Sequence, residues 1–240
     1  MSGSVTLLLA RHGLTAETGV SLAGRAPGLP LDDRGRDQAE ALARRLSTLR
    51  LDAVISSPLE RCAETAAILA RGADTHPTVR TDERFLELDY GDWTGRSLTD
   101  LSKEPLWPVV QAHPSAVTFP AGEAMAAAAA RAVSAVRDHN ATLAARHANP
   151  VYLVCSHGDI IKSLLADALG LHLDQFQRIQ VDPCSLSVVR YTATRPFVLR
   201  VNDTGGAVSG LAPDDTTASG DAVVGGGGGG STSPDRPSTA

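Results

Sequence analysis

Two apolar stretches near opposite ends of the chain end in the same kind of motif. Residues 5–10 lead into Arg11 and His12. Residues 151–156 lead into His157. Short apolar runs of β-compatible residues are typical of buried strands, and open α/β folds bind ligands at the carboxyl ends of their strands. The sequence therefore predicts a sheet that brings His12 and His157 to one edge, where Arg11 adds a positive charge.

A third segment adds a second cation. Residues 53–55 are typical of a short strand, and Ser57, Pro58 and Arg61 follow them. Serine is a common N-cap and proline suits the first helical position, so a helix is predicted to begin at Pro58. Arg61 would then lie in the opening turn, where the helix dipole attracts anions. The three segments together indicate an anion site.

Strand and helix patterns alternate through most of the chain. Helical spacing of apolar residues predicts helices from residue 33 onward, over 58 to about 71, over 122 to about 147, and directly after His157. Two late strands, at 186–191 and 197–201, are predicted to form a hairpin. Such alternation is typical of a largely parallel sheet that is covered on both faces. We expect an α/β fold: a three-layer sandwich with a mostly parallel central sheet flanked by helices, and a small cap insertion.

The composition changes after residue 203. Residues 204–240 are rich in Gly, Ser and Pro and include an uninterrupted glycine run at 225–230. Such a segment cannot bury enough apolar surface to offset the entropy of ordering it. We therefore expect one folded domain over residues 1–203 and a disordered tail over 204–240.

Charge, hydropathy and cysteine content exclude several classes of protein. The net charge of −5, of which −3 lies in the tail, argues against nucleic acid as a main partner. No apolar run is long enough to cross a bilayer, and Arg11 interrupts the first one before it could act as a signal peptide. The cysteines have no metal-ligand spacing and form no even disulfide set, so we interpret them as buried, reduced thiols in a cytoplasmic protein. They are Cys62, Cys155 and Cys184.

Together, these motifs resemble the histidine phosphatase superfamily, in its phosphoglycerate-mutase-like branch. The main motifs are Arg-His-Gly at 11–13, Arg61 within Ser-Pro-x-x-Arg-x-x-x-Thr-Ala, and Ser-His-Gly at 156–158. Further matching segments lie at 30–39, 86–95 and 119–123. All of them occur in the family's order between residues 5 and 201. Each motif is weak alone, and their specificity comes from the set.

The resemblance implies a metal-independent phosphatase that needs no cofactor and acts on a small phosphorylated metabolite. It makes His12 the nucleophile that becomes phosphorylated. Arg11, Arg61 and His157 would hold the phosphoryl oxygens. Glu87 would protonate the leaving oxygen and then help water to attack the phosphohistidine. The catalytic residues are then His12, Glu87 and His157.

The chemistry of these residue types suits those roles. An imidazole has to be neutral to attack phosphorus, and its near-neutral pKa permits this. The transferring phosphoryl group spreads charge over three oxygens, which two guanidinium groups can bind with paired hydrogen bonds. A phosphate dianion favours a protonated His157, whereas His12 must be unprotonated. The two imidazoles therefore need different environments.

The chain departs from the family pattern close to the nucleophile. Many members have Glu or Gln where Leu14 stands, and Asn where Thr18 stands. Thr15 is retained, and we expect both Thr15 and Thr18 to bind the phosphate. These departures leave open a phosphate-binding module with weak catalysis.

The acidic residues near the expected catalytic segment have competing interpretations. Glu83 precedes the same segment as Glu87, and either could be a solvated surface carboxylate. We favour Glu87 from its place in the motif. Asp89 is interpreted as a structural loop residue, and Glu123 as a charge at a helix start, where the dipole favours it.

The remaining aromatic and histidine residues carry weaker signals. Trp93 and Trp107 fit either a substrate pocket or the core. We interpret five histidines in polar or loop settings as surface residues: His76, His113, His139, His147 and His172.

A phosphatase that acts through phospho-His12 is the leading hypothesis. Family mutases have a longer insertion than this chain has between Glu87 and Gly122, so we favour hydrolysis over phosphoglycerate-mutase-like transfer. A phosphomutase and a weakly catalytic binding module stay as alternatives. The sequence leaves open the substrate, which residues 95–119 help to select, the role of the tail, and the oligomeric state, for which a homodimer is one alternative.

Overall fold

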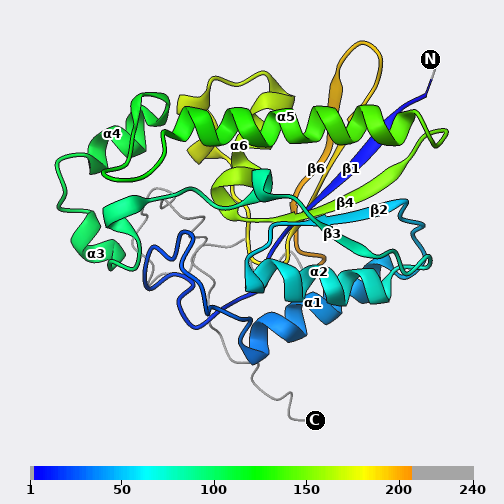
Figure 1. The fold of residues 1–240 in the computed structure, drawn as a ribbon, viewed down its shortest axis with the longest axis horizontal. Coiled ribbons are helices and arrows are strands. Elements are labelled where there is room, and N and C mark those ends of the chain that lie inside the picture. Colours follow the sequence, from blue (N-terminus) through cyan, green and yellow to red (C-terminus); the bar gives the residue numbers. More distant parts are fainter. Residues whose placement is uncertain (1–2, 207–240) are drawn as a thin grey trace, which may run out of the picture.

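A six-stranded sheet runs through the middle of the molecule (Figure 1). The computed structural model describes residues 3–206, so the predicted tail from residue 207 onward lies outside the described residues. The strands are β1 (Val5–Arg11), β2 (Ala53–Ser56), β3 (Val79–Thr81), β4 (Val151–Ser156), β5 (Leu186–Tyr191) and β6 (Pro196–Asp203). Their order across the sheet is β3-β2-β4-β1-β5-β6, and β5 runs antiparallel to both of its neighbours. The expected mostly parallel sheet is confirmed.

Helices cover both faces of this sheet. The α-helices are α1 (Asp33–Leu46), α2 (Glu60–Gly72), α3 (Leu98–Leu101), α4 (Trp107–Ala112), α5 (Met125–Ala144) and α6 (Gly158–Leu169). Short 3-10 helices are η1 (Glu83–Phe85), η2 (Gly91–Trp93), η3 (Pro114–Ala116) and η4 (Leu173–Arg178). Helices α1 and α2 pack on one face, and α5 and α6 pack on the other (Figure 1).

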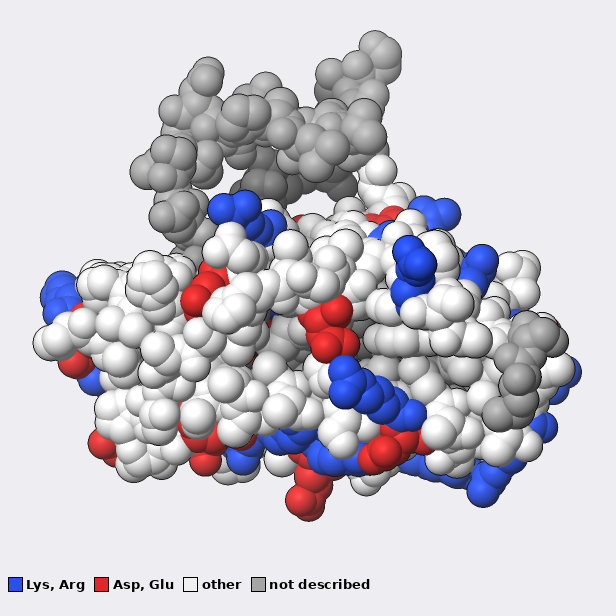
Figure 2. Space-filling model, turned by 90° about the horizontal axis from the view of Figure 1, so that it is seen from above, with Lys and Arg blue, Asp and Glu red and all other residues white. Residues whose placement is uncertain are grey.

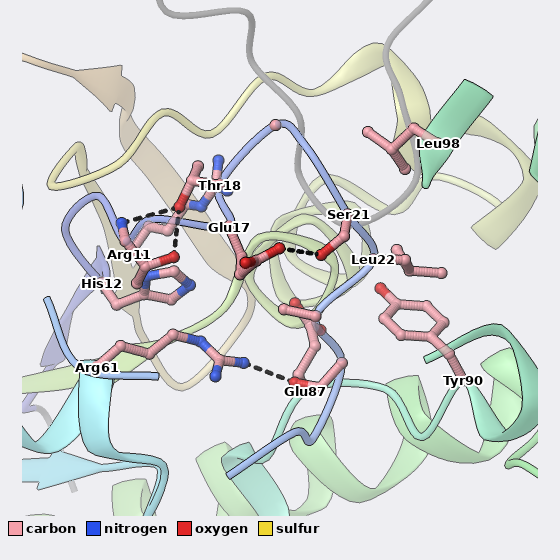
Figure 3. Close-up of a pocket in the computed structure, with 14 residues that line it drawn as sticks. Arg11, His12, Glu17, Thr18, Ser21, Leu22, Arg61, Glu87, Tyr90 and Leu98 are labelled. Atoms are coloured by element: carbon pink, nitrogen blue, oxygen red, sulfur yellow. Dashed lines mark hydrogen bonds between the residues drawn. The ribbon is translucent and has the colours of Figure 1, made fainter. Parts of the chain in front are cut away.

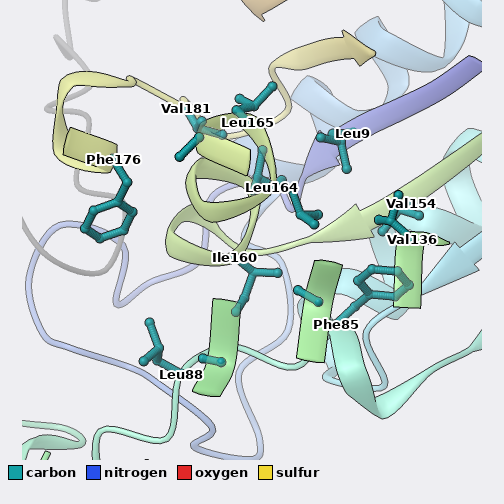
Figure 4. Close-up of a cluster of buried hydrophobic side chains, with 14 of the residues drawn as sticks. Leu9, Phe85, Leu88, Val136, Val154, Ile160, Leu164, Leu165, Phe176 and Val181 are labelled. Carbon is teal, nitrogen blue, oxygen red and sulfur yellow. The ribbon is translucent and has the colours of Figure 1, made fainter. Parts of the chain in front are cut away.

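The alternation of side chains along β1 explains these layers. Leu7 and Leu9 belong to the core that the sheet shares with α5 and α6. Leu8 and Ala10 belong to the core that it shares with α1 and α2. Figure 4 shows Leu9 in the same cluster as Leu164 of α6. A strand that is buried on both faces needs a continuous apolar run, which is the pattern seen in the sequence.

Helix α2 begins two residues later than expected. Its first residue is Glu60 rather than Pro58, and its N-cap is Leu59. Ser57 lies outside the helix, and its Oγ is 2.8 Å from Nε2 of His157. The prediction that Ser57 caps this helix is wrong, because a hydroxyl that suits a cap can equally bond a distant side chain.

The remaining predicted helices and strands agree with the structure apart from their ends, whereas β3, α3 and α4 were not predicted. The helix expected over 122–147 is shorter at both ends, since α5 spans Met125–Ala144. Strand β3 was not expected, because three residues, two of them exposed, carry too little alternation to be detected. Helix α1 from Asp33, helix α6 directly after His157, and the β5–β6 hairpin confirm the corresponding predictions, and the structure adds Asp32 as the N-cap of α1.

Residues 95–119 form the expected small cap, which contains α3, α4 and η3. Trp93, at its base, is 2% exposed and packs against Trp107 and Phe119. The ring centroids of the two tryptophans are 6.2 Å apart. Of the two interpretations, core packing therefore holds for Trp93, and Trp107 stacks on it at the edge of the core.

The surface shown in Figure 2 carries acidic and basic side chains interspersed with uncharged ones. Among residues 3–206, no helix has the length and apolar character that a bilayer crossing requires. The three cysteines are free and buried, as the sequence predicted.

The loop after β1 lies against the start of α1 with almost no space between the two backbones. The N–H of Asp32 donates to the carbonyl oxygen of Leu14 at 3.0 Å. A Cβ added at Gly35 would lie 2.1 Å from that same oxygen, which is closer than any real contact. The missing side chain at Gly35 therefore lets α1 support the loop that follows His12.

Gly35→Ala is expected to lower the free energy of unfolding by about 1–3 kcal/mol, because the new methyl group forces the loop and α1 apart. Urea denaturation followed by circular dichroism measures the change. Asp37→Ala, at an exposed position of the same helix, is the control and should shift stability by no more than about 0.5 kcal/mol. Equal midpoints for the two variants would contradict the prediction.

Candidate active site

The parallel pairing of β1 with β4 places the two His-Gly motifs side by side. Arg11 is paired with Ser156 in the register, and the N–H of His12 donates to the carbonyl oxygen of Ser156 at 3.0 Å. His12 and His157 directly follow these two strands and therefore lie at the same edge of the sheet. Their ring centroids are 5.2 Å apart, with an interplanar angle of 62°.

The surroundings of His12 set its tautomer and its charge. Its Nδ1 is 2.8 Å from the carbonyl oxygen of Gly13. Because a carbonyl oxygen only accepts, Nδ1 carries the proton and Nε2 keeps its lone pair. Burial, followed by the guanidinium groups of Arg61 and Arg11, holds the pKa of His12 well below its usual value. The imidazole is therefore neutral near pH 7 and able to act as a nucleophile.

Two guanidinium groups lie in the same pocket as His12 (Figure 3). Arg11 and Arg61 are both nearly fully buried. Arg11 donates to the carbonyl oxygen of Val181 at 2.7 Å, and Arg61 donates to that of Gly24 at 2.6 Å. These main-chain contacts orient the two groups. Two forked, delocalised cations side by side suit an anion with several oxygens, such as a phosphate.

Two threonines also line this pocket. The N–H of Thr15 donates to Oγ1 of Thr18 at 3.0 Å, and the two hydroxyl oxygens are also 3.0 Å apart. Thr15 is buried and Thr18 is half-buried. The structure thus brings both threonines to the pocket that contains the two arginines.

His157 is fully buried as the N-cap residue of α6. It contacts His12 but does not itself line the pocket. Its Nε2 is 2.8 Å from Oγ of Ser57 and 3.4 Å from Sγ of Cys62. Burial, followed by the charge of Arg61, holds the pKa of His157 well below its usual value. Since a phosphate dianion would oppose the effect of Arg61, we expect His157 to gain a proton only together with such an anion.

Glu87 lines the same pocket and is 4% exposed. Burial, followed by the negative charge of Asp159, raises its pKa to about 7. Near neutral pH the side chain is therefore divided between acid and carboxylate and can both give and take a proton. Glu83, the alternative in the sequence, is exposed and does not line the pocket. The geometry favours Glu87.

Two arginines that the sequence did not single out hold the main chain at Glu87. Nε of Arg25 and Nη2 of Arg131 donate to the carbonyl oxygen of Glu87, at 2.8 and 3.1 Å. The same two guanidinium groups donate to Oε1 of Glu123, at 2.8 and 2.7 Å. The interpretation of Glu123 as a helix-start charge is therefore wrong. Helix α5 begins only at Met125. The Glu123 carboxylate instead balances the charges of Arg25 and Arg131, the two arginines that hold the main chain at Glu87.

A second buried network lies next to Glu87. The hydroxyl of Tyr90 donates to Oδ2 of Asp159 at 2.8 Å. Nζ of Lys162 is 3.9 Å from Oδ1 of Asp159 and donates to Oε1 of Gln177 at 3.0 Å. Asp159 and Lys162 are 0% and 2% exposed. The lysine offsets a buried charge that would otherwise be costly, and the aspartate raises the pKa of Glu87.

The interpretation of His139 as a surface residue is wrong. Its side chain is 25% exposed, its Nε2 is 2.8 Å from Oδ2 of Asp82, and its ring stacks on Phe85. Helix α5 turns this position toward η1, which the polar neighbours of His139 in the sequence did not indicate. His113 and His172 are strongly exposed, as expected. Within residues 3–206, no group of three or more His, Cys, Asp or Glu side chains is arranged to hold a metal ion.

A family model agrees with this geometry. The model of the histidine phosphatase superfamily (branch 1) matches residues 7–204. The chain therefore belongs to the histidine phosphatase superfamily, as its motifs predicted. It is 32% identical over 206 residues to phosphoserine phosphatase 1 of Hydrogenobacter thermophilus, covering 83% of this chain and 93% of that protein. It is 34% identical over 212 residues to the probable phosphoglycerate mutase GpmB of Proteus mirabilis, covering 85% and 93%.

Known structures share the fold. A mycobacterial glucosyl-3-phosphoglycerate phosphatase superposes with a TM-score of 0.72 at 25% identity, over 83% of this chain and 99% of that one. The YhfR protein of Bacillus stearothermophilus superposes with a TM-score of 0.73 at 28% identity, over 83% and 97%. The expected α/β sandwich and the expected enzyme class, a histidine phosphatase, are confirmed.

Proposed function

We propose that this histidine phosphatase hydrolyses small phosphomonoesters in two steps, through a phosphohistidine on His12. One observation carries the proposal: a single pocket holds a neutral imidazole, two buried guanidinium groups and a carboxyl group whose pKa is about 7. These are the nucleophile, the anion site and the proton carrier that phosphoryl transfer from an alcohol requires.

In the first step, the lone pair of Nε2 of His12 attacks phosphorus. The ester P–O bond breaks, its electrons go to the alcohol oxygen, and protonated Glu87 gives that oxygen its proton. Arg11 and Arg61 bind the phosphoryl oxygens, with Thr15 and Thr18 as neutral donors. His157, which contacts His12 without lining the pocket, adds a positive charge behind it once the dianion is bound. The products are phosphohistidine, the free alcohol and the Glu87 carboxylate.

In the second step, the Glu87 carboxylate takes a proton from water, whose oxygen attacks phosphorus. The P–N bond breaks, and its electrons return to Nε2 of His12. Inorganic phosphate leaves, and Glu87 is protonated again. A pKa of about 7 suits both steps, because the acid and the carboxylate forms of Glu87 are both populated near neutral pH.

The proposed substrate is a small phosphorylated metabolite. Relatives are named for phosphoserine and for glucosyl-3-phosphoglycerate, which are compounds of this size. We place the reaction in the cytoplasm, since three free, buried thiols suit a reducing compartment.

A phosphomutase is the second candidate, because the GpmB relative carries that name. A mutase would return the phosphoryl group to another hydroxyl of a bound sugar acid instead of to water. The short cap over residues 95–119 and the carboxylate of Glu87 beside the nucleophile favour hydrolysis.

Trapping of the intermediate tests the proposal. Wild-type protein is mixed with phosphorus-labelled p-nitrophenyl phosphate in the presence of a chelator and quenched in alkali within milliseconds. We expect label that is stable in alkali and labile in acid, on the peptide that contains His12. Phosphate release without such a species would overturn the proposal. Isomerisation of 3-phosphoglycerate with a bisphosphate primer, without phosphate release, would establish the mutase instead.

A further inference from the structure

We propose that Glu17 makes the enzyme select phosphomonoesters whose alcohol half offers hydrogen-bond donors and carries no carboxylate. This inference rests on the proposed function and concerns the part of the pocket beyond the phosphate site. The alcohols that fit are polyols and amino alcohols, since hydroxyl and ammonium groups both donate to a carboxylate.

Glu17 lies in the loop between β1 and α1 and lines the pocket together with Ser21, Tyr90 and Leu98 (Figure 3). It is half-buried, so its carboxylate is held at the pocket instead of extending into solvent. The hydroxyl of Ser21 donates to Oε2 of Glu17 at 2.6 Å. This contact fixes the direction in which the carboxylate points.

The second oxygen of this carboxylate is available to a substrate. Within residues 3–206, Oε1 of Glu17 accepts no hydrogen bond, and no Lys or Arg forms an ion pair with the side chain. Glu123, by contrast, is paired with two arginines. The free oxygen of the Glu17 carboxylate can therefore accept a hydrogen bond from a hydroxyl or an ammonium group of a bound molecule.

The distribution of charge along the pocket sets the preference. Its lining cations are Arg11 and Arg61, which the phosphoryl group occupies. The rest of the lining in the described residues consists of neutral side chains and the acids Glu17 and Glu87. A carboxylate on the alcohol half would therefore meet like charge with no cation to offset it, and juxtaposed like charges disfavour binding.

Two matched pairs of substrates test the inference. sn-Glycerol 3-phosphate differs from 3-phosphoglycerate in having a hydroxymethyl group in place of the carboxylate. Phosphoethanolamine lacks the carboxylate of phosphoserine. We expect kcat/KM to favour the carboxylate-free member of each pair by about 10-fold or more in the wild type. The first pair exchanges the carboxylate for a hydroxyl donor, and the second removes the carboxylate while both members keep the ammonium donor.

Variants of Glu17 connect this preference to the residue. We expect the ratio within each pair to fall toward one in Glu17→Gln and to reverse in Glu17→Lys, which supplies the missing cation. Glu83→Gln removes an exposed carboxylate outside the pocket and should leave the ratio at its wild-type value. The ratio is informative because changes in phosphoryl chemistry affect both members of a pair and cancel.

The outcomes separate this inference from the proposed function. Hydrolysis of p-nitrophenyl phosphate reports the phosphatase reaction itself, and its absence would count against the proposed function. If that ester is hydrolysed but the wild type prefers the carboxylated members, or the ratios are the same in both Glu17 variants as in the wild type, the inference is overturned.

Discussion

His12→Ala is expected to reduce phosphate release from p-nitrophenyl phosphate by at least about 10⁴-fold, because the substitution removes the Nε2 lone pair that attacks phosphorus in the proposed mechanism. Initial rates at saturating substrate, with a chelator present, measure the effect.

The folded state should survive this substitution. His12 is surrounded by two guanidinium groups that already disfavour its protonation, so its removal takes no stabilising charge pair from the pocket. Circular dichroism and binding of vanadate, a phosphate analogue, check this point. His113→Ala, at an exposed site, is the control and should keep full turnover. Turnover of His12→Ala close to that of the control would show that His12 is not the nucleophile.

Glu87→Gln is expected to lower the single-turnover rate of alkyl phosphates by about 10²–10⁴-fold, because an alkoxide is a poor leaving group without a proton donor. p-Nitrophenolate leaves without a proton, so its release should be affected much less. The variant should then give a burst of p-nitrophenol followed by a slow steady state, since Glu87 also assists the attack of water. Rapid-mixing absorbance measurements separate the two phases.

The pH profile gives an independent check on Glu87. Its pKa is raised to about 7, so the protonated fraction that donates to the leaving group falls as the pH rises through that value. The wild-type single-turnover rate with an alkyl phosphate should therefore decline above about pH 7, and this decline should be missing in Glu87→Gln. Glu83→Gln should keep both the rate and the decline. A decline that persists in Glu87→Gln would assign the proton donor to another group.

The sequence carried enough information to predict the sheet and the residues at its edge. The apolar runs before His12 and His157 are nearly continuous because both strands are buried on both faces. This pattern can be recognised in the sequence without knowing which strands pair. Parallel pairing then brings the ends of the two strands together. Arg61 was predictable because proline and serine indicated a helix start nearby, and it lies in the first turn of α2 although that helix begins at Glu60, two residues later than predicted.

The contacts that support the site residues could not be predicted from local sequence patterns. Ser57 reaches His157 from 100 positions away, and Arg25 reaches Glu123 from 98. Neither contact alters the periodicity of apolar residues in the segments that it joins, so the sequence pattern gives no sign of it. Asp159 and Lys162 occupy positions that look solvent-facing in the sequence, but α6 is buried even on that side. The raised pKa of Glu87 depends on this burial, so it could not be inferred from residue types alone.

The central position of β1 has a consequence for the synthesis of the protein. Its neighbours in the sheet, β4 and β5, begin at Val151 and Leu186, so β1 leaves the ribosome well before the two strands that pair with it. Until then its apolar side chains lack their partners, and a nascent chain of this kind depends on protection against aggregation. A ribosome stalled before residue 151 would display His12 without His157. The pocket around His12 can therefore be completed only after β4 and the residues that follow it have been synthesised.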